Sequence, residues 1–367
     1  MTAAAPRPTP RLEALTGLRG LAAWYVVFYH LRLSLTGLLP APAIAALAKG
    51  YLAVDLFFML SGFVLWLSYA PALAAPTTDS VVRFWWRRMA RIWPLHAVVL
   101  AGFVGLAAVL ALTGRDTAGY PPAELPLHLL LVQNWGFTPD LAWNHPAWSI
   151  SAEMAAYLLF PLLAWCGRGA WPVGRVLLLA ALLLGGLHAL FAAHGADRLG
   201  AAIPTLGLPR CLLEFTLGTL LARLWLGWHD HPCAARRAGQ LAAGAGLTGL
   251  AGWALALPET AWVPLAFAQA LLALALDRGR LARGLAHGPL HWLGEVSYST
   301  YLCHFGLFIG FKLLWVDATL QLDAVRLAGF VGLLLGVSAL GHRLVELPAQ
   351  RALTRLAPAR RLRPGAA

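Results

Sequence analysis

The sequence predicts an all-α fold, a polytopic membrane helix bundle of about ten transmembrane helices. Of the 367 residues, 59% belong to the hydrophobic set and only 12% are charged, about half the charged share of an average soluble protein. The mean hydropathy is +0.67. A soluble domain of this length needs more polar surface than this composition supplies, and a disordered chain is much less hydrophobic.

Ten apolar segments follow one another along the chain, each close to the roughly 20 residues that a membrane-spanning helix requires. We expect all of them to be helices, because the bilayer offers no partner to an unpaired backbone group. Proline- and glycine-rich loops separate them, and the loop 114–146 is longer than the others. The expected spans are residues 14–33, 51–70, 92–113, 147–166, 173–192, 203–226, 238–257, 259–276, 290–313 and 323–345.

The distribution of basic residues predicts the orientation of the bundle. If the N-terminus is cytoplasmic, nineteen of the 28 Lys and Arg residues fall on the cytoplasmic side, six fall outside and three lie within spans. Short cytoplasmic loops of membrane proteins carry such an excess of basic residues. We therefore expect both termini in the cytoplasm. The net charge of +12 is explained by the membrane, so nucleic acid is not an expected partner.

A single membrane domain is expected to fill residues 1–367, because no polar stretch is long enough to bury a core of its own. Its core is expected over residues 12–348, followed by a short basic cytoplasmic tail at 349–367. The four cysteines form no CxxC pair, so we expect neither a disulfide framework nor a metal site.

Titratable residues inside the spans point to a functional site, since each costs at least a few kcal/mol and needs a partner or a function. His30 lies near the outer end of the first span, about 16 Å beyond Arg19 on the same helix face. Asp55 and Glu153 lie one and two turns below the outer ends of their spans. A base oriented by an acid is a recurring catalytic arrangement. We predict that His30 shares a layer with both carboxylates; the alternative is a histidine that only packs.

The other charged residues of the spans are interpreted as structural. Arg210 precedes Glu214 by four residues in the sixth span, which predicts an ion pair within one helix. Glu346 lies at the inner end of the last span. We expect it to cap that helix or to pair with Arg343 or Arg351.

The segment Phe84–Pro94 is basic and aromatic and lies at the expected cytoplasmic surface. Arg88 and Arg91 are about one helical turn apart, so their side chains face the same way. Guanidinium groups bind phosphates, whereas Trp and Arg side chains also anchor helices at the membrane surface. The sequence leaves both functions open for this segment.

Five segments resemble, in the same order, those of the acyltransferase-3 family of bacterial integral membrane acyltransferases, whose members include O-acetylases of surface polysaccharides. Together they cover nearly all of the chain. They are Arg19 and His30 in the arginine–ten residues–histidine signature, YLAVDLFFMLSGF at Tyr51–Phe63, the paired Arg88 and Arg91 before Ile92-Trp93-Pro94, WSISAE at Trp148–Glu153 with Tyr157, and LGEVSYSTYLCH at Leu293–His304.

Two positions depart from the family pattern. Ala53 replaces a glycine, which is a minor change. Met154 follows Glu153 where the family often has a second acid, so any role of that second acid is absent from this chain.

The resemblance implies transfer of an acyl group, often acetyl, from a cytoplasmic acyl-CoA to a hydroxyl of a sugar or related acceptor, in the bacterial cytoplasmic membrane. Acyl-CoA is then the donor substrate, and no bound cofactor is expected. On this hypothesis Arg88 and Arg91 hold the CoA phosphates, and Arg19 lines the path of the donor. Trp148 and Tyr298 are expected to stack on a sugar or a nucleotide base, with membrane anchoring as the alternative.

In the same hypothesis His30 is either the general base on the acceptor hydroxyl or an acyl-accepting nucleophile. Asp55 or Glu153 orients its imidazole and stabilises the charged form. Two rival functions use the same residues differently. A proton-coupled transporter would use them as a proton relay, although the sequence shows no internal repeat of the kind common in transporters. A catalytically silent scaffold would leave the charged layer without a function.

Overall fold

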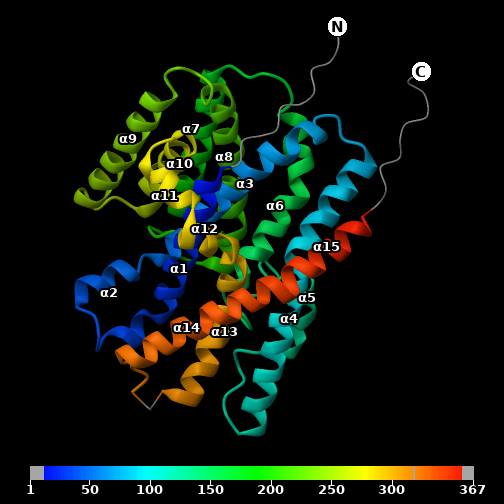
Figure 1. Ribbon diagram of the computed structural model, residues 1–367, viewed down its shortest axis with the longest axis vertical. Helices are drawn as coiled ribbons and strands as arrows, with labels where there is room; N and C mark the ends of the chain where they lie inside the picture. The colour runs from blue at the N-terminus through cyan, green and yellow to red at the C-terminus, as the bar shows by residue number, and fades with distance from the viewer. Residues whose placement is uncertain (1–11, 317–318, 358–367) are drawn as a thin grey trace.

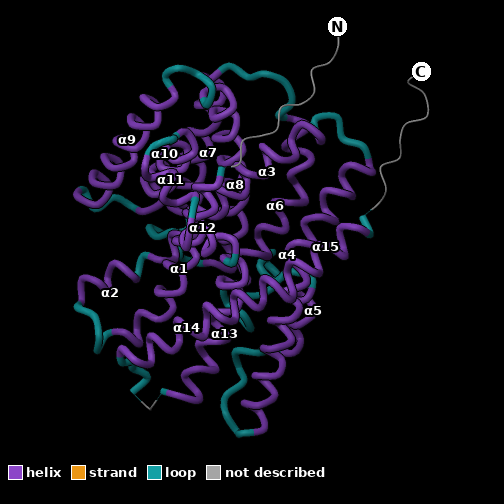
Figure 2. The backbone as a smooth tube through the Cα atoms, viewed as in Figure 1, coloured by secondary structure: helices purple, strands orange, loops and turns teal. Residues whose placement is uncertain are grey.

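The protein is a bundle of helices joined by short connections. The structure, a computed structural model, describes residues 12–316 and 319–357, and these residues contain no strand (Figure 1, Figure 2). The helices are α1 (Glu13–Leu31), α2 (Ala41–Leu47), α3 (Ala53–Leu73), α4 (Thr78–Leu112), α5 (Leu125–Leu129), α6 (Ala147–Cys166), α7 (Val173–Ala193), α8 (Ile203–Trp228), α9 (Ala234–Ala254), α10 (Glu259–Leu276), α11 (Arg280–Ala286), α12 (Gly288–Glu295), α13 (Ser297–Trp315), α14 (Ala324–Leu340) and α15 (Leu347–Arg355).

Seven helical stretches in the described part of the chain are long and apolar enough to cross a bilayer. They are α2 continued by α3, then α4, α6, α7, α8 and α10, and finally α14 continued by α15. The all-helical, multi-pass fold is thereby confirmed. The expected spans on α1, α9 and α13 are also helical, but these helices contain more small and polar residues. A total of ten spans and two cytoplasmic termini stay predictions.

Two helix boundaries differ from those expected. Helix α4 begins at Thr78, well before residue 92, because Thr77 and Ser80 form a capping box in which each side chain accepts the other's backbone N–H. The basic aromatic segment is therefore part of a helix. The span 290–313 is divided at Val296 into α12 and α13. A helix that ends leaves carbonyls unpaired, and the carbonyl of Gly294 accepts hydrogen bonds from two side chains.

Glycines allow the closest contact in the centre of the bundle, between α3 and α8. A Cβ atom built on Gly62 would lie 1.9 Å from the carbonyl oxygen of Phe215, and one on Gly218 would lie 2.0 Å from that of Met59. Small residues let membrane helices approach in this way, where van der Waals packing drives association. Two helices distant in the sequence thus pack with their backbones in close contact.

Close contacts at glycines also hold the start of α1 against α11 and α12. A Cβ on Gly17 would lie 2.1 Å from the carbonyl oxygen of Leu285, and one on Gly294 would lie 1.9 Å from that of Thr16. Gly20 faces the backbone of Leu293 and Gly294. The close approach of these backbones determines where the side chain of Arg19, which lies between the two glycines of α1, is directed.

The loop 114–146 returns into the bundle instead of only covering its surface. Gln133, Asn134 and Asn144 are buried. The side-chain amide of Gln133 donates to the carbonyl of Ala147 at 3.2 Å, and that of Asn144 donates to the carbonyl of Leu302 at 3.0 Å. These bonds hold the start of α6 against α13.

The last helix continues beyond the expected end of its span. A π-helical segment, Gly341–Glu346, joins α14 to α15 (Figure 1). The indole of Trp86 on α4 donates to the carbonyl of Leu353 at 2.6 Å. The first part of the expected tail, up to Arg355, is therefore helical and packs beside α4; residues 358–367 lie outside the described residues.

Candidate active site

A cavity of about 740 Å³ lies among α1, α3, α4, α6, α12 and α13. This volume is within the range of small-molecule binding sites. Five residues that the sequence singled out line its wall: Arg19, Arg88, Arg91, Glu153 and Tyr298. The structure thus brings together, from four helices, most of the residues expected to bind the donor and one of the predicted catalytic carboxylates.

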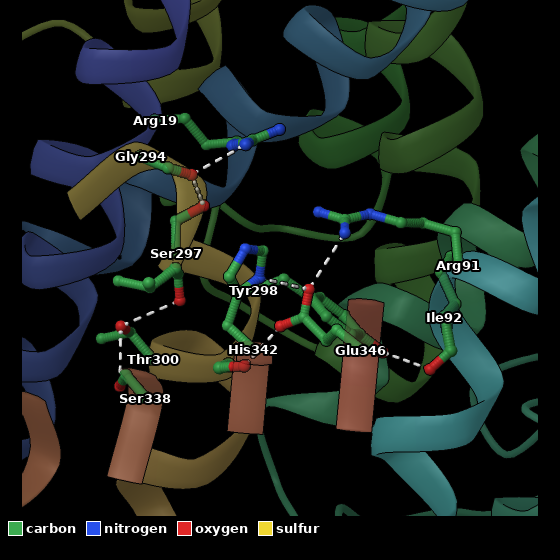
Figure 3. A network of polar contacts seen from close by, with 12 residues as sticks. Arg19, Arg91, Ile92, Gly294, Ser297, Tyr298, Thr300, Ser338, His342 and Glu346 are labelled. Atoms are coloured by element: carbon green, nitrogen blue, oxygen red, sulfur yellow. Dashed lines mark hydrogen bonds and ion pairs between the residues drawn. The ribbon is translucent and has the colours of Figure 1, made fainter. Parts of the chain in front are cut away.

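Arg19 enters the cavity from α1. One terminal nitrogen of its guanidinium donates to the carbonyl of Gly294 at 2.7 Å. Figure 3 shows the guanidinium groups of Arg19 and Arg91 pointing toward one another from opposite walls. Two like charges that face a common space favour an anion between them.

Arg88 and Arg91 of α4 are held by different partners. Arg88 donates to the hydroxyl of Tyr69 at 2.9 Å, and Arg91 forms an ion pair with Glu346 at 3.0 Å. A guanidinium has five N–H donors. The hydrogen bonds among the described residues engage one nitrogen of each of these side chains, so both retain donors for a ligand.

Glu346 is a member of this site that the sequence interpretation missed. It lies in the π-helical segment with its side chain buried, and it accepts hydrogen bonds from Arg91 and His342 (Figure 3). It also accepts a hydrogen bond from the hydroxyl of Ser299. The expected pairing with Arg343 or Arg351 is wrong. A π-helical turn changes the direction in which side chains leave the helix, and an argument from regular helical spacing does not include that change.

Glu153 faces the same cavity from α6. Its carboxylate accepts a hydrogen bond from the hydroxyl of Tyr157 at 2.6 Å, and this hydroxyl lies 3.3 Å from that of Ser61. The carboxylate is thereby oriented by its own helix and by α3. Among the described residues its hydrogen-bond partners do not include His30.

The two aromatic residues expected to stack on substrate lie in different places. Tyr298 lines the cavity, with its hydroxyl donating to the carbonyl of Ile92 at 2.7 Å and the Arg91 guanidinium 5.8 Å from its ring. Trp148 is buried in the core, where its ring packs edge-on against Phe58. It does not line the cavity, so in this conformation it supports the bundle and does not offer a stacking surface.

Asp55 is engaged by a residue from another helix. Arg210 of α8 donates to both of its carboxylate oxygens at 2.6 Å and also to the carbonyl of Leu199 at 2.7 Å. The expected pair of Arg210 with Glu214 is therefore wrong. Arg210 forms two parallel hydrogen bonds with the carboxylate of Asp55 on α3. We expect this bidentate pair to be stronger than a pair with Glu214 one turn further along the same helix. Glu214 is fully buried, and its oxygens have no hydrogen-bond partner among the described residues.

His30 contacts a second histidine instead of a carboxylate. Its Nδ1 lies 3.1 Å from Nε2 of His304 and 3.0 Å from the carbonyl oxygen of Val26. The rings of Phe305 and Tyr29 pack edge-on against its imidazole. The predicted layer is thus divided into three networks, one around His30, one around Asp55 and one around Glu153. The proposed chemical roles of these residues stay predictions.

His304 was missed as a site residue, although it ends one of the family-like segments. His304 lies three residues after Tyr301, so the two residues are about one helical turn apart. In the structure His304 contacts the carbonyl and the ring of Tyr301. Tyr301 itself lines the cavity with Ser149, and their hydroxyls are 2.7 Å apart. Tyr301 therefore connects the cavity to the histidine pair.

The polar groups that line the cavity include three guanidinium groups, of Arg19, Arg88 and Arg91. In residues 12–316 and 319–357, no group of three His, Cys, Asp or Glu side chains is placed to hold a metal ion. The four cysteines of the chain are free thiols.

Comparison with known proteins places the chain in a family. The family described as "Acyltransferase domain", acyltransferase-3, matches residues 12–341. Acyltransferase MdmB of Streptomyces mycarofaciens is 32% identical over 96% of this chain and 95% of its own length. The putative membrane-bound transacylase BcsY of Komagataeibacter xylinus is 27% identical over 92% of this chain and 83% of its own.

Exopolysaccharide production protein ExoZ of Rhizobium meliloti is 29% identical over 70% of this chain and 75% of its own. No solved structure matches at a significant level. The match of the family over nearly the whole chain, together with full-length similarity to an acyltransferase, shows that this multi-pass membrane protein is an acyltransferase enzyme of the acyltransferase-3 family.

Proposed function

We propose that the protein transfers an acyl group, in the first place acetyl, from cytoplasmic acyl-CoA to a hydroxyl group of a sugar, a polysaccharide unit or a related acceptor. The observation that carries this proposal is the cavity in which three guanidinium groups converge. Acyl-CoA is a thioester that carries several phosphate charges, and Arg side chains are well suited to bind phosphates.

The position of the cavity supports entry of the donor from the cytoplasm. Its wall includes Glu13 at the start of α1 and Ser68 near the end of α3, and the excess of basic residues predicts that both helix ends are cytoplasmic. In our proposal Arg88 and Arg91 hold the phosphates. In the same proposal Arg19 contacts the pantetheine arm or the thioester, and the acyl end points toward Tyr301.

The proposed chemistry is an attack of the acceptor hydroxyl on the thioester carbonyl. His30 takes the hydroxyl proton, the new C–O bond forms, and the C–S bond breaks. The CoA thiolate leaves and recovers the proton from the imidazolium, so acyl-CoA and alcohol yield ester and free CoA. A general base of this kind contributes roughly a hundred- to ten-thousandfold in rate. The alternative, an acyl-histidine, is tested by trapping labelled protein after denaturation.

The acceptor is proposed from chemistry and from the names of relatives. One relative is an exopolysaccharide production protein, which makes a glycan hydroxyl the first candidate. We further propose that the protein resides in the bacterial cytoplasmic membrane, since both the donor pool and the lipid-linked sugars meet there.

The donor site is tested with purified protein and acetyl-CoA. We expect saturable binding of acetyl-CoA that is lost in an Arg88→Ala, Arg91→Ala double variant. Arg87→Ala is the matched control, because Arg87 is exposed on the same helix and does not line the cavity. Equal binding by the double variant and the control would reassign the basic aromatic segment to membrane anchoring.

A further inference from the structure

Two imidazoles and two backbone carbonyls form a continuous chain of hydrogen bonds. Nδ1 of the fully buried His304 lies 2.6 Å from the carbonyl oxygen of Tyr301. Its Nε2 lies 3.1 Å from Nδ1 of His30, and the same Nδ1 lies 3.0 Å from the carbonyl oxygen of Val26. The chain therefore runs from α13 to α1 through both rings.

The direction of each hydrogen bond in this chain follows from its carbonyl ends. A carbonyl oxygen only accepts, so Nδ1 of His304 must carry a proton and donate it to Tyr301. In a neutral His304 the other nitrogen, Nε2, is then an acceptor. Nδ1 of His30 must therefore carry a proton and donate it to Nε2 of His304. The carbonyl of Val26, which also only accepts, requires a proton on the same Nδ1. A neutral His30 held in this way has an unprotonated Nε2.

We propose that His304 is a positioning residue that fixes His30 as the tautomer protonated on Nδ1 and leaves its Nε2 free to take the proton of the acceptor hydroxyl. The inference rests on the function proposed above. It assigns to a neutral imidazole the orienting role that the sequence assigned to a carboxylate. Both carboxylates are engaged elsewhere, Asp55 by Arg210 and Glu153 by Tyr157.

The surroundings keep the His30 ring in this orientation. Phe305 and Tyr29 pack edge-on against it at ring-centroid distances of 5.4 and 4.9 Å. The charged and titratable groups beside it are Arg32 on the same chain segment and His145 from the loop before α6, whose ring stacks on Phe305. Among the described residues, the hydrogen-bond partners of this Nδ1 are His304 and the carbonyl of Val26.

In this tautomer, Nε2 of His30 carries out both proton transfers of the reaction. Nε2 of His30 takes the proton from the acceptor hydroxyl while its oxygen forms a bond to the thioester carbon. When the C–S bond breaks, Nε2 returns the proton to the sulfur. The proton on Nδ1 stays in its bonds to His304 and Val26 throughout, so the ring does not turn between the two transfers.

Two substitutions at His304 separate its two hydrogen bonds. His304→Asn keeps a donor near the carbonyl of Tyr301 but lacks an acceptor at the distance of Nε2. His304→Gln is longer and places its amide oxygen near the position of Nε2, so it can accept from His30. His194→Asn is the matched control, because the Nδ1 of this exposed histidine also contacts a carbonyl in the preceding turn, that of Leu190, far from the cavity.

We expect His304→Asn to lower kcat by roughly a hundredfold or more, as a wrong tautomer of a catalytic base does, with the KM for acetyl-CoA unchanged. His304→Gln should recover most of kcat, and His194→Asn should be normal. In protein labelled with ¹⁵N at histidine, the NMR signals of His30, assigned by their loss in His30→Gln, should show a protonated Nδ1 in wild type and a mixture of tautomers in His304→Asn.

A His304→Asn variant that binds acetyl-CoA normally and keeps kcat within a fewfold of wild type would overturn the inference. So would a wild-type His30 protonated on Nε2. Failure of the proposed function is a different result, since the wild type would then release no CoA from acetyl-CoA; full activity in His30→Gln would refute only the role of His30 as the base. If His304→Asn does not fold, the tautomer measured in His304→Gln and in the wild type still decides.

Discussion

At the residue scale, the donor site consists of arginines whose partners differ, and this difference predicts unequal effects. Arg88→Ala removes a guanidinium whose hydrogen-bond partner, within residues 12–316 and 319–357, is the hydroxyl of Tyr69. A hydrogen bond to a charged group contributes about 1.5–3 kcal/mol, so we expect the Kd for acetyl-CoA to rise roughly ten- to a hundredfold. Lysine should restore only part of this, because it lacks the bidentate fork. Calorimetric titration of Arg88→Ala, Arg88→Lys and Arg87→Ala measures it; equal affinities in all three would contradict the assignment.

The ion pair of Arg91 with Glu346 predicts that the two residues stabilise the folded protein together. Glu346 is buried and Arg91 is its ion-pair partner. Removing one member of a buried pair leaves an uncompensated charge. We expect Arg91→Ala and Glu346→Gln each to lower the melting temperature, and the double variant to lower it by less than the sum of the two. Additive effects in this cycle would show that the pair does not act as a unit.

Sequence reasoning identified the residues of the cavity better than it identified their partners. Arg19, Arg88, Arg91, Glu153 and Tyr298 all line it, because polar residues in apolar spans are few and stand out. Their partners are set by tertiary structure. Asp55 meets Arg210, a residue more than 150 positions later, and no spacing within one helix contains that information.

At the element scale, glycine contacts hold α1 against α11 and α12 and so place Arg19. We expect Gly17→Ala to destabilise the protein by about 1–3 kcal/mol, as overpacking of a close contact does, and to weaken acetyl-CoA binding. A Cβ there would lie 2.1 Å from the carbonyl oxygen of Leu285. Gly105→Ala is the control, since its Cβ would meet nothing within 4 Å and alanine favours the helix. Thermal unfolding in detergent compares them, and equal melting temperatures would refute the packing argument.

The positions of the helices were predictable and their ends were less so. Each expected span lies on a helix, because long apolar segments leave the backbone no other way to satisfy its polar groups. The early start of α4 depends on a local cap at Thr77. The break at Val296 lies inside one expected span and the π-helical segment Gly341–Glu346 lies at the end of another, and average hydropathy does not show how the backbone winds there.

At the scale of the whole molecule, orientation decides which side receives the donor. The excess of basic residues predicts that reporters fused after residue 75 and after the C-terminus read cytoplasmic, and that one within 116–140 reads periplasmic. Paired cytoplasmic and periplasmic reporters at each position provide the measurement. A periplasmic reading after residue 75 would place the arginine cavity away from the CoA pool and would contradict donor entry from the cytoplasm.

An enzyme and a proton-coupled transporter were both compatible with the charged residues of the spans, and two further observations distinguish them. Membership of the acyltransferase-3 family favours the enzyme. The structure adds a reason, because His30, Asp55 and Glu153 lie in separate hydrogen-bond networks and do not form one continuous relay.

In the proposed reaction His30 takes the proton of the acceptor hydroxyl while acyl-CoA occupies the arginine cavity. The most direct measurement is turnover of labelled acetyl-CoA by purified, monodisperse wild type, His30→Gln and His194→Gln with a glycan acceptor. We expect wild type and His194→Gln to release CoA and labelled ester at the same rate. In His30→Gln we expect a loss of roughly a hundred- to ten-thousandfold with acetyl-CoA binding retained. Turnover by His30→Gln within a fewfold of wild type would contradict the proposed role of His30.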